Sequence, residues 1–335
     1  MKTLKFLAPL AVVFLVALGT SCKYDSKGKS TVLPNVTGSA SELIVVLDKA
    51  VWEENIGKTY IDILKADYPM IPQPEPIFDV VLVSPINFSG IFQMHRNVIV
   101  TKVSSENKKA QIVVQRDVWA TPQIVITAVG PTYPAIAEML QNEKGRLVQL
   151  IEQAERDRVV TNATKYEEKG LRLLLESKFG VSMTFPKGYR LNKDTTDFVW
   201  ISHETPHTSQ AILIYSYPYT EENTFTASYL IEKRNKFVNK LVPGPTAGSY
   251  MTTFTEILPE YSAIEYKDRY FGRLRGLWDV HAHAMGGPFI SLTTIDEANQ
   301  RVITVEGYVY APRFKKRNYL RQVEALLYTF SLVEK

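Results

Sequence analysis

The sequence predicts an α+β protein of two domains, the first a mixed α/β layer structure and the second an antiparallel sheet with packed helices. Up to about residue 160, short apolar runs alternate with segments of helical periodicity. After Gly180, strand-like runs follow one another with short turns between them. Apolar residues make up 45% of the chain and charged residues 22%, as in globular proteins.

The first 21 residues have the layout of a secretory signal peptide, with a charged start, an apolar core and a small-residue end. Lys2 and Lys5 supply the charge, and Leu7 to Leu18 form an apolar run that only Pro9 interrupts. As a helix this run would rise only ~18 Å, whereas the hydrocarbon core of a bilayer is ~30 Å thick. The segment is therefore predicted to direct export and not to span a membrane permanently.

Cys22, the single cysteine of the chain, follows these small residues. The stretch Leu18–Cys22 (LGTSC) resembles the lipobox of bacterial lipoproteins. The resemblance implies cleavage before Cys22, acylation of its sulfur and new amine, and attachment to a membrane by acyl chains alone. Lys23 stands where an Asp would signal retention in the inner membrane, which implies the outer membrane. The alternative is a secreted protein with a coincidental cysteine.

Removal of the signal peptide and acylation of Cys22 also limit the chemistry of the mature chain. No free thiol would remain, which excludes disulfides, thiolate nucleophiles and cysteine metal sites. The formal charge of +4 falls to +2 when Lys2 and Lys5 are removed, which is too near neutral to indicate nucleic-acid binding. Residues 22–41, rich in Lys, Ser, Thr and Gly, are predicted to form a flexible lipidated tether.

The first domain is predicted over residues 42–160. Leu43 to Leu47 form a continuous apolar run, which is typical of a strand covered on both faces. Four prolines between residues 69 and 76 exclude regular hydrogen-bonded structure there. Further strands are predicted at 78–83, 98–103, 112–115 and 124–129, with helices at 52–66 and from Pro134 onward, and a short helix at 88–93.

The second domain is predicted over residues 161–335. Residues 157–165 are the predicted boundary, with two helices meeting near residues 161–163. One continuous helix is the alternative, because no proline separates the two. Gly180 is placed to end the second helix. Strands are predicted at 181–185, 189–191, 198–202, 211–217, 251–255, 261–266, 270–281, 289–294 and 301–310, and helices at 225–241 and 319–330.

Two histidines are candidate metal ligands. His281 and His283 are two apart on a predicted strand, so their side chains would share one face of the sheet. If His203 and His207 lay alongside, four imidazoles could hold zinc or copper. The alternative is that these are exposed histidines on a sheet face and in a loop.

The densest local signal lies in the RGLW and MGGPF motifs. Arg273 and Arg275 share one strand face, so with Trp278 they could grip an anionic ligand. Backbone amides of Gly286 and Gly287, in a special turn, would add donors. The alternative is a hairpin with Trp278 in the core and both arginines paired with carboxylates. The glycine spacing fits neither a Rossmann nor a Walker loop.

Arg96 is a further candidate ligand-binding residue, because it lies in an otherwise apolar stretch of the first domain. A buried arginine needs a carboxylate partner, and the candidates are Glu53, Glu54, Asp79 and Asp117. It could instead bind an acidic ligand. No Gly-x-Ser-x-Gly motif indicates a serine hydrolase, and nothing points to a glycosidase pair of carboxylates.

Several motifs together resemble the DUF4837 family of Bacteroidetes lipoproteins over nearly the whole mature chain. Besides the lipobox, they are PQPEP (Pro72–Pro76), HRN (His95–Asn97), RGLW (Arg275–Trp278), MGGPF (Met285–Phe289) and VYAP (Val309–Pro312). The resemblance implies a cell-envelope protein and assigns no catalytic residue. Residues 179–189 are also similar to the opening of PsbP/Mog1-type sandwiches, which are mostly binding and assembly factors. Fold similarity by itself does not establish function.

These observations favour a lipid-anchored cell-envelope protein, at the outer membrane, that acts as a non-enzymatic binding or assembly module without a cofactor. Its partners would be the membrane, through the Cys22 acyl chains, and an envelope protein or glycan, but no nucleic acid. The alternatives are a metal-dependent or other hydrolase that uses His281 and His283, and a spacer between outer membrane and wall. A pocket lined by Arg273, Arg275 and His281 would favour a ligand, whereas a flat aromatic patch would favour a protein partner.

Overall fold

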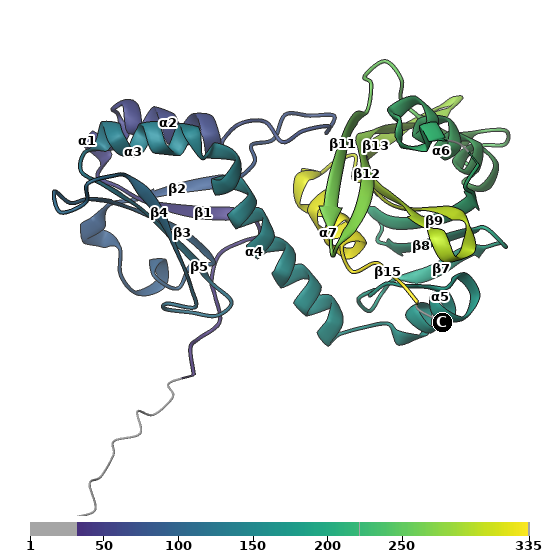
Figure 1. Ribbon diagram of the computed structural model, residues 1–335, viewed down its shortest axis with the longest axis horizontal. Coiled ribbons are helices and arrows are strands. Elements are labelled where there is room, and N and C mark those ends of the chain that lie inside the picture. Colours follow the sequence, from purple (N-terminus) through teal and green to yellow (C-terminus); the bar gives the residue numbers. More distant parts are fainter. Residues whose placement is uncertain (1–31, 221, 334–335) are drawn as a thin grey trace, which may run out of the picture. The chain divides into compact units, whose positions relative to one another are not determined.

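The computed structural model describes residues 32–220 and 222–333, in which helices pack on two main sheets (Figure 1). The predicted fold class, α+β, is confirmed. The predicted signal peptide and the lipidation site Cys22 lie outside the described residues. Within those residues, no helix combines the length and the apolar character needed to cross a bilayer.

The N-terminal region is a mixed sheet with helices on one face. Its strands follow the order β2-β1-β3-β5-β4, in which β4 is antiparallel to β5 and the other pairs are parallel. Its elements are β1 (Glu42–Val46), α1 (Lys49–Trp52), α2 (Asn55–Leu64), β2 (Asp79–Val83), β3 (Asn97–Val103), β4 (Gln111–Arg116), β5 (Ile124–Gly130), α3 (Tyr133–Asn142) and α4 (Lys144–Lys165). Helices α2 and α3 lie side by side over one face of the sheet (Figure 1).

Strand β1 shows why a continuous apolar run becomes a central strand. Its side chains alternate, so that Leu43 enters the core beneath the helices and Ile44 enters a smaller cluster on the opposite face. That second face is covered by loops, in which Phe88 packs edge to face against Trp119 at a centroid distance of 5.4 Å. Both faces of the strand therefore need apolar side chains, as predicted.

Residues 33–41 are not a free tether, which corrects the predicted extent of that segment. Asn35 and Thr37 form backbone bridges to the loops that precede β5 and β3. Gly38, at φ +87°, packs against His95, whose Nε2 would lie 2.2 Å from a Cβ at that position. The polar composition of the segment suggested a linker, but backbone groups of polar residues pair as readily as those of apolar ones.

The helix predicted from Pro134 onward is divided in two, α3 and α4. Helix α4 then continues to Lys165 and a separate helix, α5 (Lys169–Phe179), follows. The predicted pair of helices is therefore confirmed, but the junction lies at residues 166–168 and not at 161–163. Ala163 is buried in the core of the C-terminal region, and no proline interrupts the backbone hydrogen bonds there. The next helix ends as predicted at Gly180, which has φ +63°.

The C-terminal region is an antiparallel sheet in the order β10-β12-β13-β14-β9-β8-β7, with β11 also paired to β12. Its elements are α5 (Lys169–Phe179), β6 (Val181–Ser182), β7 (Arg190–Asp194), β8 (Phe198–Glu204), β9 (Ser209–Pro218), α6 (Ala227–Leu241), β10 (Tyr250–Thr253), β11 (Glu260–Tyr266), β12 (Arg269–His281), β13 (His283–Asp296), β14 (Arg301–Tyr310), α7 (Arg317–Leu327) and β15 (Ser331–Leu332). Short β6 and β15 pair with each other.

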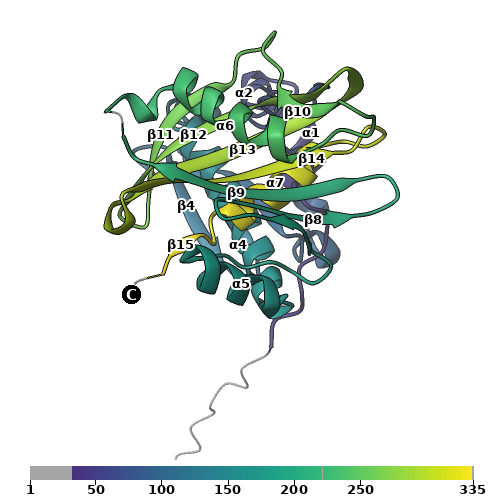
Figure 2. The same ribbon diagram turned by 90° about the vertical axis from the view of Figure 1, so that its right-hand side faces the viewer.

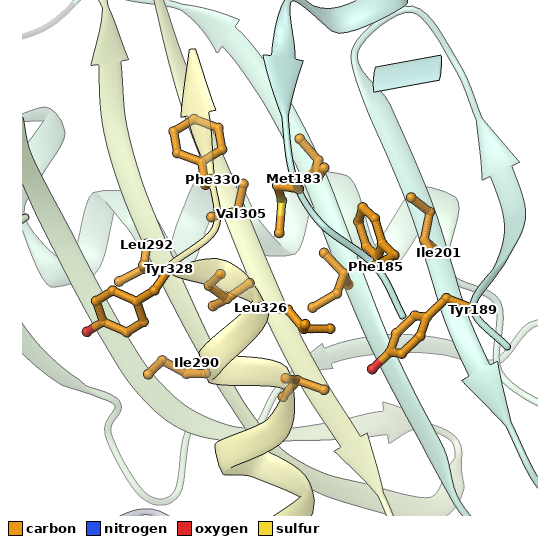
Figure 3. Close-up of a cluster of buried hydrophobic side chains, with 14 of the residues drawn as sticks. Met183, Phe185, Tyr189, Ile201, Ile290, Leu292, Val305, Leu326, Tyr328 and Phe330 are labelled. Atoms are coloured by element: carbon orange, nitrogen blue, oxygen red, sulfur yellow. The ribbon is translucent and has the colours of Figure 1, made fainter. Parts of the chain in front are cut away.

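Helices cover both faces of this sheet, so alternate residues along its strands enter two different cores. On one face α7 packs through Leu326 against Ile290 and other side chains of the sheet (Figure 3). On the other face α6 packs over a core that contains Phe289, the neighbour of Ile290. Figure 2 shows α6 and α7 on the two sides of the strands.

A buried ion pair fixes α6 to the sheet. Arg234 of α6 and Glu306 of β14 are both fully buried. The guanidinium donates to the carboxylate through Nε and Nη2 at distances between 2.8 and 3.1 Å. Nη1 donates to the Thr253 hydroxyl at 2.9 Å, and the guanidinium lies over the Phe289 ring. Burial raises the pKa of the Glu306 carboxyl, and the pairing with Arg234 opposes that rise.

Candidate functional site

Strand β12 places the predicted site residues on opposite faces of the C-terminal sheet. Arg273 and Arg275 are on the face of α7, whereas Trp278 belongs to the core beneath α6. The structure therefore does not bring these three side chains together around one anionic ligand.

Arg275 has its partners inside the chain. Its Nη2 donates to both carboxylate oxygens of Glu324 on α7 at 3.0 Å, and its Nη1 donates to the Tyr68 hydroxyl at 2.9 Å. The two charged side chains are only 11% and 9% exposed. Burial works to lower the pKa of Arg275, but the Glu324 carboxylate and the Tyr68 hydroxyl outweigh it and raise that pKa. Arg275 is thus committed to a structural ion pair.

Arg96 and Arg273 also have partners inside the chain. Arg96 pairs with Glu155 of α4 at 2.8 Å, and not with any of the four carboxylates predicted for it. Arg273 donates through Nε to the Ser262 hydroxyl of β11 at 3.0 Å. Arg275 therefore matches the alternative predicted for the hairpin, a carboxylate partner, whereas Arg273 bonds to a hydroxyl. Arg96 has the carboxylate partner predicted for a buried arginine, but from a different residue.

Arg275 belongs to a polar cluster that joins α4, α7 and the chain that follows α2. The polar cluster consists of Tyr68, Glu152, Arg275, Arg321 and Glu324. Arg321 of α7 pairs with Glu152 of α4 at 2.8 Å, and its guanidinium lies 5.0 Å from the centre of the Tyr68 ring. The adjacent cavity of about 60 Å³ has room for only a few water molecules.

The proline-rich segment of residues 69–76 adds a further contact with α7, next to the polar cluster. Its Glu75 carboxylate accepts hydrogen bonds from the backbone N–H groups of Lys316, at 2.5 Å, and Arg317, at 3.2 Å. These groups lie at the start of α7, where backbone N–H groups have no partner within the helix and a negative charge is favourable. The PQPEP motif thus caps a helix that is distant in sequence.

Gly286 and Gly287 lie within β13 and not in a turn, which corrects the prediction. They pair with Asp279 and Trp278 of β12. A Cβ on Gly287 would lie 2.1 Å from the Val309 carbonyl oxygen, and one on Gly286 would lie 2.6 Å from that of Trp278. Glycine is required because neighbouring backbone approaches closely.

His281 and His283 flank a tight turn and do not lie on one strand, which is a further correction. His281 ends β12, Ala282 has φ +62°, and His283 begins β13. Both imidazoles are exposed, and His281 stacks on Tyr250 at a centroid distance of 4.9 Å. In residues 32–220 and 222–333, no group of three or more histidine, cysteine, aspartate or glutamate side chains is arranged to hold a metal ion. The predicted convergence of four imidazoles is not formed there.

Trp278 lines a pocket of about 400 Å³ on the α6 face of the sheet. We refer to it as the aromatic pocket. It lies between the β8–β9 turn and the loop that follows α6. Its apolar wall includes Trp200, Met251, Trp278, Met285, Tyr308 and Tyr310, and its polar side includes Glu204, Thr205, His207, Thr208 and Ser209.

The indole of Trp278 is held against two tyrosine rings, at centroid distances of 5.3 Å from Tyr308 and 6.3 Å from Tyr310. Trp278 is 1% exposed. Among the described residues, its Nε1–H has no hydrogen-bond acceptor. An unpaired buried donor costs about 1–3 kcal/mol. The nitrogen itself is buried, so an acceptor from outside the chain could reach it only if the surrounding side chains moved.

The polar groups at the rim of the aromatic pocket bond to one another. Ser209 donates through its hydroxyl to the Glu204 carboxylate at 2.7 Å, and the hydroxyls of Thr205 and Thr208 lie 2.8 Å apart. Burial raises the pKa of the Tyr308 hydroxyl, so this ring stays neutral. The pocket thus combines a neutral wall of rings with a carboxylate at its rim.

Sequence reasoning identified Trp278 but missed the residues around it. Tyr308 and Tyr310 are two apart on β14, and this alternation was a usable signal that they share a face. Trp200 lies on β8, and the place of β8 in the sheet follows from pairing between strands that are distant in sequence. No local pattern carries that information.

Two family models match the chain in separate stretches. The model of DUF4837, a domain of unknown function, matches residues 170–329, which include the aromatic pocket. The model of DUF8532, also a domain of unknown function, matches residues 36–164. The resemblance to DUF4837 is therefore supported for the C-terminal region. The PQPEP and HRN motifs lie instead in the stretch matched by DUF8532, which corrects the predicted extent of that resemblance.

A comparison with curated proteins found no match. Among solved structures, the Ran-binding protein Mog1p of Saccharomyces cerevisiae has a TM-score of 0.31 at 8% identity, over 46% of this chain and 91% of that one. The human StarD13 lipid transfer and protein localization domain has a TM-score of 0.19 at 11% identity, over 49% and 95%. A structure from Bacteroides thetaiotaomicron has a TM-score of 0.21 at 10% identity, over 47% and 46%. Scores this low carry no argument about fold or function.

Proposed function

We propose that this protein is a lipid-anchored binding module of the cell envelope, and that the aromatic pocket is its binding site. The observation that carries the proposal is the ring-lined pocket of about 400 Å³, in whose wall the unpaired N–H of Trp278 is buried. Ligand pockets usually enclose about 300–1,000 Å³ and combine apolar walls with a few polar groups. The aromatic pocket fits that description.

The pocket favours a ligand with an apolar face and at least one hydrogen-bond acceptor. Aromatic side chains supply flat apolar surface, and an indole N–H can only donate. The Glu204 carboxylate at the rim would repel an anion, so a neutral or positively charged ligand is favoured. Envelope peptides and glycans both offer acceptors of this kind.

The described residues give the alternative hydrolase no support. His281 and His283, on which it depended, flank a turn and are exposed. The candidate arginines Arg96 and Arg275 are engaged in ion pairs away from the aromatic pocket. We therefore propose binding and not catalysis.

A photo-crosslinking amino acid at His207, an exposed residue at the pocket rim, tests this in the full-length protein in cells. We expect an adduct with a defined molecule from this position. The matched control is Leu173 on α5, which is 56% exposed and should give no such adduct. Met285→Glu places a charge in the apolar wall and should reduce the adduct about tenfold.

Equal adducts from both positions would contradict the proposed site, as would an adduct that Met285→Glu leaves unchanged. The anchor is tested separately by incorporation of a labelled fatty acid. Cys22→Ala should abolish incorporation, because it removes the sulfur that would carry the acyl chains. Unchanged incorporation would contradict the proposed lipidation site.

A further inference from the structure

The loop between β2 and β3 is an exposed apolar segment without charge. Residues 84–94 contain no Asp, Glu, Lys, Arg or His. Ile86, Ile91 and Phe92 are 89%, 62% and 38% exposed. Single exposed apolar residues are ordinary, but three within one short uncharged loop indicate an interaction surface. The loop lies on the face of the N-terminal sheet opposite α2 and α3 (Figure 1).

The base of this loop is fixed, so its shape is set before any partner binds. Phe88 packs against Trp119 over the buried face of the sheet. Gln123 donates to the Gln93 carbonyl at 2.6 Å, and Gln93 donates to the Phe88 carbonyl at 3.3 Å. A loop that is already ordered loses little conformational entropy when it binds.

The chain that leads from Cys22 reaches the N-terminal region beside this loop. Thr37 donates through its backbone N–H to the Met94 carbonyl at 2.9 Å, and through Oγ1 to the Ile91 carbonyl at 3.3 Å. Cys22 lies fifteen residues before Thr37, a span of about 55 Å at most. Acyl chains on Cys22 would therefore keep the loop within about 55 Å of a bilayer, close enough for contact.

We propose that the loop of residues 84–94 is a second membrane contact, which inserts its apolar side chains into the bilayer interface next to the lipid anchor. The inference rests on the lipid anchoring proposed above. A few apolar side chains give only weak membrane binding by themselves, but the anchor makes the contact intramolecular and raises its effective concentration. Because the loop has no charge, its contact depends on apolar burial and not on salt.

A second exposed apolar pair provides a matched control within the same chain. Ile257 and Leu258, between β10 and β11, are 48% and 74% exposed. Glu256 and Glu260 flank them. These carboxylates oppose insertion among anionic headgroups. We expect this second loop to stay in water.

The experiment uses the acylated full-length protein, in which acylation blocks Cys22 and an introduced cysteine is the single free thiol. Ile86→Cys, Ile91→Cys and the control Leu258→Cys are labelled with an environment-sensitive fluorophore. Each protein is reconstituted into vesicles of phosphatidylethanolamine and phosphatidylglycerol. Labels at the first two positions should be quenched by acyl-brominated lipid and should lose about tenfold in accessibility to iodide. The label on the control should remain accessible.

Labels at positions 86 and 91 that stay as accessible as the control, in vesicle-bound protein, would overturn the membrane contact and leave the anchor intact. Protein that fails to sediment with the vesicles would overturn the anchor, and the inference with it. Shielding of the two labels in native envelopes but not in vesicles would also overturn the proposal, in favour of a protein partner.

Discussion

The two faces of strand β12 carry polar side chains in opposite situations. Toward α7, the Arg275 guanidinium donates to Glu324 and Tyr68. Toward α6, the Trp278 N–H has no acceptor among the described residues. Both residues belong to one four-residue motif, and both were predicted to bind a ligand. The comparison teaches that partners within the chain, and not residue type, decide whether a buried polar group is left unpaired.

The largest effect is expected from Arg234→Met, which removes the most enclosed charge on the α6 face. Glu306 would then be buried without its partner, and we expect the free energy of unfolding to fall by about 3–5 kcal/mol. Lys233→Met, one residue earlier and partly exposed, should cost about 0–1 kcal/mol. Denaturant unfolding measures both. Equal losses of unfolding free energy in the two variants would contradict the prediction that removing a buried charge destabilises the fold more than removing a partly exposed one.

A smaller effect is expected from Arg275→Met, on the opposite face of β12. Loss of the hydrogen bonds to Glu324 and Tyr68 should lower the free energy of unfolding by about 2–3 kcal/mol. The control Arg273→Met loses a bond to the Ser262 hydroxyl and should cost about 1 kcal/mol. Neither variant should change crosslinking from His207. If Arg275→Met abolished that adduct, the two faces would not be independent.

The smallest effect is expected on acid sensitivity. Burial works to raise the pKa of Glu324, but Arg275 and Arg156 outweigh it and hold that pKa below its ordinary value of 4.5. A carboxyl with a lowered pKa stabilises the fold above its unfolded pKa, and this stabilisation is lost as the pH falls through its folded pKa.

Glu324→Gln should therefore flatten the decline of stability below about pH 4.5, because the substituted group no longer takes up a proton on unfolding. Denaturant unfolding at a series of pH values between neutral and acid measures the slope. A slope that matches the unsubstituted protein would mean that folding does not lower the pKa of Glu324.

Local patterns were sufficient to predict most strands and helices, because side-chain periodicity reports which faces are buried. They failed at the turn between His281 and His283. Ala282 occupies a left-handed conformation there, at φ +62°, where Gly or Asn is the usual signal. With neither present, an apolar run that turns back on itself looks like one continuous strand.

The contacts that decide the candidate site could not be predicted, because they join distant parts of the chain. Arg275 meets Tyr68 across 207 residues, and Arg96 meets Glu155 across 59. Periodicity identifies which side chains are polar in an apolar setting, as it did for Arg96. Whether a partner is already present depends on the order of strands and helices, which no local signal carries.

The contact between Glu75 and the start of α7 also bears on the order in which the molecule is completed. Lys316 follows Glu75 by 241 residues, a delay of roughly 12–50 s at ribosomal rates of ~5–20 residues per second. Until then the Glu75 carboxylate has no helix to cap, and Tyr68 has no Glu324 beside it. A chain that stops before α7 would therefore lack both of these contacts, however well its N-terminal region had folded.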